Sequence, residues 1–311
     1  MNQNKSLPRL KIVLLVIAFL ASLGLGTNYI LDKISPDQID NQFNTLPSFK
    51  IQPELWPLSY GKIVDSSGIE AKALILINED TGEIIAHRQA DTKYPMASTT
   101  KIMTAALALE FLNPNSQITI PETVFDGLPP DSALMGISAG EKYTLEELLY
   151  GLMLNSGNDA ANAIALAVSG NQNDFVSLMN AKAIQLGLKQ TNFTNPSGLD
   201  HPDHYTTARE LAVIAHYARS FPLFKEIVKA PTKTIPYTEN HKYIELTNLN
   251  PLLSIYPGTT GIKPGNTGEA GNCLVASVNR NGGRFIGVLL DTPGRNSNMA
   301  ALFDLGYDSL Q

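Results

Sequence analysis

The chain is poor in the side chains that build disulfides and metal sites. It has one cysteine, Cys273, in 311 residues, so no internal disulfide can form and no cysteine pair is available for a structural zinc site. Histidine is also scarce: there are five, and only His201 and His204 lie close together. A polar loop explains such a pair, and we expect no bound metal.

Positive charge is the second shortage. Lys and Arg number 23 against 29 Asp and Glu, a formal net charge of −6. A nucleic-acid-binding protein needs a basic face, so the composition argues against that class and leaves small-molecule and peptide substrates open. Hydrophobic residues make up 43% and charged residues 17%, which predicts a folded chain with one large domain or two modest ones.

The N-terminus carries the one long uncharged run. Lys5, Arg9 and Lys11 precede residues 12–31, and no acid occurs before Asp32. Twenty such residues span about 30 Å as a helix, the thickness of a bilayer core, and flanking positive charge keeps that end cytoplasmic. We expect residues 1–31 to be a cytoplasmic stub and single-pass anchor in the cytoplasmic membrane. The alternative is a cleaved signal peptide and a secreted protein.

A polar, proline-containing segment follows the uncharged run. Residues 32–60 include Pro36, Pro47, Pro53 and Pro57 and read as a flexible linker. The folded domain is expected at residues 61–311.

Strand patterns occur at both ends of this domain and helical patterns between them. Two hairpins are predicted, the second around the turn Asn281-Gly282-Gly283. Their strands are 71–77 with 83–88 and 273–278 with 284–291, and the helices are 98–112, 145–154, 159–168, 174–186, 207–219 and 297–310. Capping boxes are predicted for Thr144 with Glu147 and for Thr207 with Glu210. This order favours one sheet built from both chain ends, with a helical subdomain inserted.

Three short motifs carry the chemistry. Ser98 and Lys101 open the most apolar helix, and residues at i and i+3 share a helix face. The lysine can therefore reach the serine hydroxyl and take its proton if burial lowers the lysine pKa. Ser156-Gly157-Asn158 lies between two predicted helices, and Lys263-Pro264-Gly265 lies near a C-terminal strand. Taken singly, these motifs also fit a helix cap and two turns.

The order S-x-x-K, S-x-N, K-x-G is that of penicillin-binding proteins and serine β-lactamases. The sequence resembles this superfamily from about residue 71 to 310, most closely the low-molecular-weight D-alanyl-D-alanine carboxypeptidases of peptidase family S11. The likeness extends to four longer stretches: YPMASTTKIMTAALALE, GEKYTLEELLYGLMLNSGNDAANAIA, NPSGLDHPDHYTTARELA and GTTGIKPGNTGEAG.

The resemblance implies a β-lactamase/transpeptidase-like α/β fold, with an antiparallel sheet flanked by helices. It implies an enzyme that removes the terminal D-alanine of peptidoglycan stem pentapeptides through an acyl-serine, uses no cofactor and is acylated by β-lactams. In these roles, Ser98 matches the nucleophile, Lys101 its general base and Ser156 a hydroxyl that relays protons to the leaving D-alanine.

The same resemblance assigns the substrate-binding residues. Asn158 matches the side chain that hydrogen-bonds the substrate backbone and Lys101, and Lys263 matches the cation that attracts the terminal carboxylate. The oxyanion hole would be the N–H groups of Ser98 and Asn266. Gly265 permits close backbone approach, and Thr267 completes the set.

The third motif departs from the family at Pro264, where threonine is usual. Proline supplies neither a hydroxyl nor an N–H for the substrate carboxylate, although an edge strand tolerates it. Thr267 is near enough in the sequence to compensate. We therefore keep two alternatives: a D,D-endopeptidase acting on cross-links, and a non-catalytic wall-binding scaffold of the same fold.

Two related enzymes share the nucleophile. A class A β-lactamase needs a glutamate after the second motif, which the region beyond Val168 does not supply, and usually has Asp where Gly157 stands. A transpeptidase forms the same acyl-serine and transfers it to an amine, so the motifs do not separate it from a hydrolase. The short chain favours hydrolysis.

Overall fold

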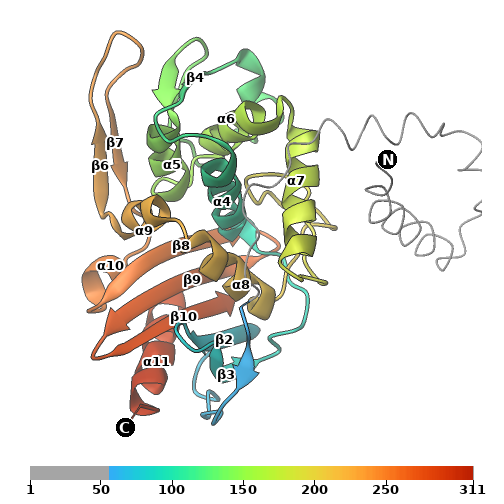
Figure 1. Cartoon of the computed structure of the whole chain (residues 1–311), viewed down its shortest axis with the longest axis vertical. Coiled ribbons are helices and arrows are strands. Elements are labelled where there is room, and N and C mark those ends of the chain that lie inside the picture. Colours follow the sequence, from blue (N-terminus) through green and yellow to red (C-terminus); the bar gives the residue numbers. More distant parts are fainter. Residues whose placement is uncertain (1–55, 311) are drawn as a thin grey trace, which may run out of the picture. The chain divides into compact units, whose positions relative to one another are not determined.

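The computed structural model describes residues 56–310, and the predicted anchor at 12–31 lies outside them, as does the linker before residue 56. Figure 1 shows a sheet in the lower part of the domain and a group of helices above it. The sheet has the strand order β1–β3–β2–β10–β9–β8. Its strands are Ser59–Tyr60 (β1), Ala73–Asn78 (β2), Glu83–Arg88 (β3), Thr259–Thr267 (β8), Gly271–Arg280 (β9) and Gly283–Leu290 (β10).

The two ends of the domain meet at the centre of this sheet. Strand β10 pairs antiparallel with β2, with Gly287 opposite Leu76. The β9–β10 turn has positive φ at Asn281 and Gly282, the combination that a two-residue hairpin turn requires. The prediction of one sheet from both chain ends is confirmed. Strand β1 is an exception to the predicted antiparallel pairing, because it runs parallel to β3.

The central strands are buried on both faces. Leu74 and Leu76 belong to the core cluster that includes α11 (Arg295–Asp308), whose Phe303 is fully buried. Their neighbour Ile75 is also fully buried, and side chains alternate between sheet faces along a strand. The other face is covered by α8 (Ala208–Ala218), which packs on β10 and β2. Burial on both faces explains why the sequence of these strands shows little alternation between apolar and polar residues.

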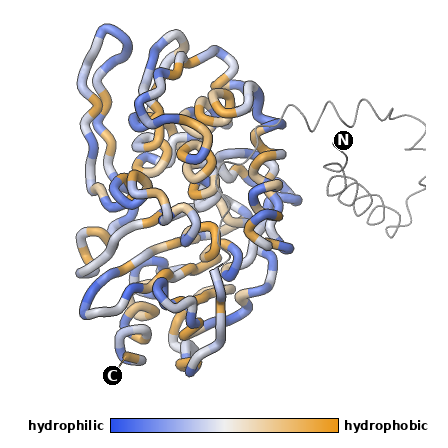
Figure 2. Tube along the Cα trace, in the orientation of Figure 1, coloured by the Kyte–Doolittle hydropathy of each residue, from blue (hydrophilic) through white to orange (hydrophobic). Residues whose placement is uncertain are grey.

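The helical part surrounds α4, which carries the first motif at its start (Figure 1). Figure 2 shows many apolar residues along the helices of this part, and hydrophilic residues at the tip of the hairpin formed by β6 (Thr232–Ile235) and β7 (Ile244–Thr247). The elements are η1 (Ala97–Thr100), α4 (Lys101–Phe111), η2 (Glu122–Phe125), α5 (Leu145–Met153), α6 (Asn158–Ser169), α7 (Gln172–Gln185), α9 (Pro222–Lys229) and α10 (Leu252–Ile255). All six predicted helices are present, although the first begins as the 3-10 turn η1, while α9, α10 and η2 were not predicted.

Two small sheets were also not predicted. They pair β4 (Gln117–Thr119) with β5 (Lys142–Thr144), and β6 (Thr232–Ile235) with β7 (Ile244–Thr247). Strands of three or four residues are too short for an alternating pattern to distinguish them from loops.

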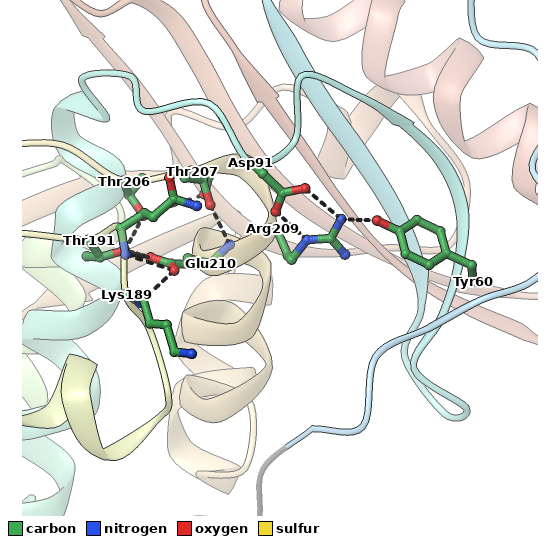
Figure 3. A network of polar contacts seen from close by, with 9 residues as sticks. Tyr60, Asp91, Lys189, Thr191, Thr206, Thr207, Arg209 and Glu210 are labelled. Carbon is green, nitrogen blue, oxygen red and sulfur yellow. Dashed lines mark hydrogen bonds and ion pairs between the residues drawn. The ribbon is translucent and has the colours of Figure 1, made fainter.

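One predicted capping box is complete and the other is half formed. At α5, Thr144 accepts from the Glu147 N–H and Glu147 reaches back to the Thr144 N–H. At α8, Thr207 accepts from the Glu210 N–H, but the Glu210 carboxylate turns away. It binds the N–H groups of residues 189 and 190 and the hydroxyl of Thr191 (Figure 3). Glu210 therefore anchors the segment before α8 instead of closing the cap.

The described end of the predicted linker packs against the domain. Trp56 stacks on His216 of α8 with ring centroids 4.1 Å apart. Tyr60 lies in β1, and its hydroxyl accepts from Arg209, which also pairs with Asp91 (Figure 3). Residues 56–60, within the segment predicted to be a linker, therefore pack against the folded domain.

Candidate active site

Ser98 lies in the short 3-10 turn η1, directly before α4. Two side chains of the turn bind its own backbone: Thr99 Oγ1 donates to the Met96 carbonyl at 2.5 Å and Thr100 Oγ1 to the Ala97 carbonyl at 2.8 Å. Ala97 has a φ of 48°, a left-handed conformation that is uncommon for alanine. The surrounding contacts hold the turn in this geometry and place Ser98 at the edge of a groove.

Lys101 reaches Ser98 as the three-residue spacing predicts, with Nζ 3.1 Å from Ser98 Oγ. Its amine also lies 2.7 Å from Asn158 Oδ1 and 2.7 Å from the Ser197 carbonyl oxygen. These two oxygens only accept hydrogen bonds. A neutral amine has two N–H groups for them, and its remaining lone pair then faces the serine hydroxyl.

The surroundings of Lys101 favour that neutral form. The side chain is fully buried. Burial first, and then the positive charge of Lys263, hold the pKa of Lys101 well below its ordinary value, while Asp159 opposes the shift. A buried lysine bonded to a hydroxyl, an amide and a carbonyl can accept a proton from serine near neutral pH.

The second motif forms a strained connection between α5 and α6. Ser156 has a φ of 60° and is 5% exposed. In the described part of the chain its hydroxyl makes no hydrogen bond to Ser98 or Lys101. Asn158 begins α6, and its N–H donates to the Ala133 carbonyl at 2.8 Å. The turn therefore presents the Asn158 side chain to Lys101 and its backbone to the groove wall.

Asp159, which the sequence reasoning did not select, holds that wall in place. Its buried carboxylate accepts from the N–H groups of Met135, Gly136 and Ile137 at 2.7, 2.8 and 3.2 Å, and from that of Ala160 at 2.8 Å. Asp159 directly follows the second motif, so its position in the sequence could have indicated a role at the site. Three of its partners lie 22 to 24 residues away, and the sequence does not reveal them.

The third motif lies in the edge strand β8, whereas an isolated reading suggested an exposed turn. Lys263 is fully buried, and among the described residues its Nζ has no hydrogen-bond partner. Burial, and then the charge of Arg295, lower the pKa of Lys263 to about 7. Arg295, at the start of α11, is thus a second cation here and was not predicted. It lines a separate cavity with Asn272.

Gly265 brings β8 against Ser98. A Cβ at this position would lie 2.9 Å from the Ser98 N and 3.0 Å from the Ala97 Cβ. Any side chain would push the strand away from η1, so the glycine is required for close approach.

Asn266 and Thr267 follow at the groove. The Asn266 amide donates to Asn272 Oδ1 at 3.1 Å. Thr267 Oγ1 donates to Asp200 Oδ1 at 2.6 Å and accepts from the Ala270 N–H at 3.1 Å. The Thr267 hydroxyl therefore donates its proton to Asp200. It does not take the place of the threonine hydroxyl that is absent at Pro264.

The groove of about 440 Å³ joins residues from the first two motifs with Asn266, Thr267 and Gly268, which directly follow the third motif. Its lining is Ser98, Pro129, Asp131, Ser132, Ala133, Asn158, Ser197, Gly198, Leu199, Asp200, Asn266, Thr267 and Gly268. The loop 197–200 in this lining was not predicted as part of the site. An accessible serine, a buried lysine base and a nearby cation define the class of active-site-serine acyl-transfer enzymes.

Comparison with known proteins defines the family. The model of the D-alanyl-D-alanine carboxypeptidases, peptidase family S11, matches residues 61–294, and the chain belongs to this family. It is 34% identical over 269 residues to the D-alanyl-D-alanine carboxypeptidase DacF of Bacillus subtilis, covering 83% of this chain and 68% of DacF. The crystal structure of a Streptomyces DD-transpeptidase matches with a TM-score of 0.73 at 32% identity, covering 81% of this chain and 100% of that one. A D-alanyl-D-alanine endopeptidase of Pseudomonas aeruginosa is 29% identical over 227 residues, 73% of each chain.

The pH dependence of substrate capture is expected to follow Lys263. With a pKa of about 7 in the free enzyme, Lys263 loses its charge as the pH rises, so kcat/KM for a peptide with a free terminal carboxylate should fall above pH 7. Lys263→Arg should lower the plateau but remove this alkaline limb, because arginine stays charged. The measurement is kcat/KM from pH 5 to 10 for both proteins. If kcat/KM of the arginine variant still falls above pH 7, another group causes the fall.

Proposed function

We propose that this enzyme cleaves the terminal D-alanine from peptidoglycan stem peptides that end in D-Ala-D-Ala, with Ser98 as the nucleophile. The observation that carries the proposal is the arrangement around Lys101, whose Nζ lies 3.1 Å from Ser98 Oγ and 2.7 Å from each of two carbonyl oxygens. In the neutral amine those oxygens take both hydrogens, and the lone pair is left for the serine hydroxyl. The family's activity and the names of its relatives support the substrate class.

The proposed reaction has two steps. Ser98 Oγ attacks the carbonyl carbon of the penultimate D-alanine while Lys101 takes the hydroxyl proton. The N–H groups of Ser98 and Asn266 receive the developing oxyanion, a contribution worth about 10²–10³ in rate for one donor in comparable enzymes. The C–N bond breaks, and the proton passes to the leaving amine through Ser156. Water then attacks the acyl ester, with Lys101 again as the base, and frees Ser98.

The experiment is D-alanine release by a soluble fragment that begins before Trp56, which packs on the domain. It is offered a peptide ending in D-Ala-D-Ala, with Ser98→Ala as the control. Release that the control lacks supports the proposal. Penicillin labelling of Ser98 without release would favour another peptide substrate. The absence of both labelling and release would favour the scaffold alternative.

Endopeptidase activity is the second candidate, and Pro264 favours it. A terminal carboxylate meets no hydroxyl at this position, and Thr267 already donates to Asp200. An endopeptidase cleaves within a cross-link and depends less on a terminal D-alanine carboxylate. The Pseudomonas relative named as an endopeptidase shows that the family includes proteins with that name.

Pro264→Thr is expected to strengthen the grip on a terminal carboxylate. A hydrogen bond to a charged group contributes about 1.5–3 kcal/mol, so KM for a D-Ala-D-Ala peptide should fall by about tenfold or more. Cleavage of a cross-linked dimer should change little. Both rates are compared in the two proteins, and an unchanged KM for the terminal dipeptide would contradict this role of Pro264.

We also propose that residues 12–31 anchor the enzyme in the cytoplasmic membrane with the catalytic domain outside, supported by the basic residues before the uncharged run. Between residues 56 and 310, no helix has the length and apolarity needed to cross a bilayer. Extraction of membranes with alkaline carbonate tests the anchor: retention of the full-length chain in the membrane fraction supports it, and release of a chain shortened at its N-terminus would favour the cleaved form.

A further inference from the structure

His204 connects the loop before α8 to the turn that carries the nucleophile. It is 2% exposed, and its Nε2 lies 2.7 Å from Thr100 Oγ1. The flanking chain is held by two isolated bridges, Tyr94 with Thr206 and Asn192 with Tyr205. The ring is therefore fixed at one end of a polar contact with η1.

The hydrogen bonds determine which ring nitrogen carries the proton. His204 Nδ1 lies 3.1 Å from the backbone nitrogen of Thr194, and a backbone N–H can only donate. Nδ1 is thus the acceptor, and the neutral ring has its hydrogen on Nε2. That N–H donates to Thr100 Oγ1, and the Thr100 hydroxyl donates its own hydrogen to the Ala97 carbonyl at 2.8 Å.

These hydrogen bonds, from His204 through Thr100 to the Ala97 carbonyl, are called the His204 relay here. They end on the peptide bond that supplies the Ser98 N–H. A peptide unit is planar and trans, so the Ala97 carbonyl and the Ser98 N–H point in opposite directions. Fixing the carbonyl oxygen also fixes the direction of the N–H. Gly198 covers the same oxygen from the loop side, where any Cβ would overlap it.

We propose that His204 is a positioning residue that, through Thr100, aims the Ser98 N–H at the oxyanion of the acyl-transfer transition state. The inference rests on the proposed role of Ser98. Neither ring nitrogen touches the groove chemistry directly, so His204 acts through the orientation of one peptide bond.

The environment of His204 keeps the ring neutral. Burial, more than any charge, lowers the pKa of His204 to about 4. The charged or titratable groups that act on it are His201 and Lys101, which lower its pKa, and Asp200, which raises it. Protonation would place a hydrogen on Nδ1 against the Thr194 N–H, so the relay operates above about pH 4.

The main test compares two isosteric changes within the same turn. Thr100→Val removes the relay, while Thr99→Val removes a hydrogen bond to Met96 that does not involve His204. Acylation by a fluorescent penicillin, normalised to titrated active sites, should slow by about 10–100-fold in the Thr100 variant, less than the about 10²–10³-fold loss of a whole donor. Thr99→Val should slow acylation less than Thr100→Val does, and Thr100→Ser should restore the rate.

A spectroscopic readout separates positioning from general damage. The infrared band of the acyl-ester carbonyl should move to higher frequency in Thr100→Val, because a weaker oxyanion hole polarises the carbonyl less. Thr99→Val should leave the band in place. Equal rates and equal bands in the two variants would overturn the proposal.

A second pair decides the question if Thr100→Val does not fold. His204→Gln keeps an N–H donor for Thr100, and His204→Phe does not; the glutamine variant should acylate faster per active site, and equal rates would overturn the proposal. Failure of the wild-type protein to acylate would instead count against the proposed function itself.

Discussion

Lys101→Met is expected to slow acylation of Ser98 by about 10²–10⁴-fold, the usual contribution of a general base. Methionine fills a similar apolar volume but cannot accept a proton. The change also deprives Asn158 Oδ1 and the Ser197 carbonyl of their donor, so a moderate loss of stability should accompany it. In the wild type, the rate should fall as the pH drops through the lowered pKa of Lys101, because the neutral amine is the base.

Lys182→Met provides the matched control. Lys182 is also fully buried, and it pairs with Glu110 at 2.8 Å, away from Ser98. Its replacement should lower the free energy of unfolding without changing the acylation rate per folded molecule. Rates are measured by stopped-flow labelling with a fluorescent penicillin. A Lys101→Met rate within tenfold of wild type would show that another group serves as the base.

The second large effect is expected from Asp159→Asn, which should reduce the free energy of unfolding by at least about 3 kcal/mol, since each hydrogen bond to a charged group is worth about 1.5–3 kcal/mol. The Asp159 carboxylate accepts four backbone N–H groups, three of them from residues 135–137. An amide nitrogen there would oppose at least one of these donors. The loop would move, and with it the groove wall formed by residues 131–133.

Asp174→Asn is the control for this change. Asp159 and Asp174 are both acids in the first turn of a helix, α6 and α7, so both interact favourably with the helix dipole. Only Asp159 holds a distant loop. The free energy of unfolding, measured in urea, and the rate of D-alanine release should both be lower in the Asp159 variant. Both should be nearly unchanged in the Asp174 variant. Equal effects in the two variants would show that Asp159 contributes no more than an acid in the first turn of a helix usually does.

Much of the fold could be predicted because its longer elements are locally determined. The α5 capping box, the β9–β10 turn and the apolar helix after Ser98 depend on residues within a few positions of one another. The elements that were not predicted, such as β6 and β7, are too short to show periodicity. They form because they pair with a partner strand.

The sequence by itself predicted Ser98 as the nucleophile and Lys101 as its base. The order of the three motifs indicated the family, which implies these roles, and the spacing of Ser98 and Lys101 places them within one helical turn. Only the tertiary structure decided the surroundings that make this pair reactive. Three contacts join segments from 22 to 104 residues apart in the sequence: Lys101 with the Ser197 carbonyl, Asp159 with the loop 135–137, and His204 with Thr100. The lowered pKa values of Lys101 and Lys263 likewise arise from burial between packed elements, and the amount of water excluded from a side chain is a property of packing that no local pattern records.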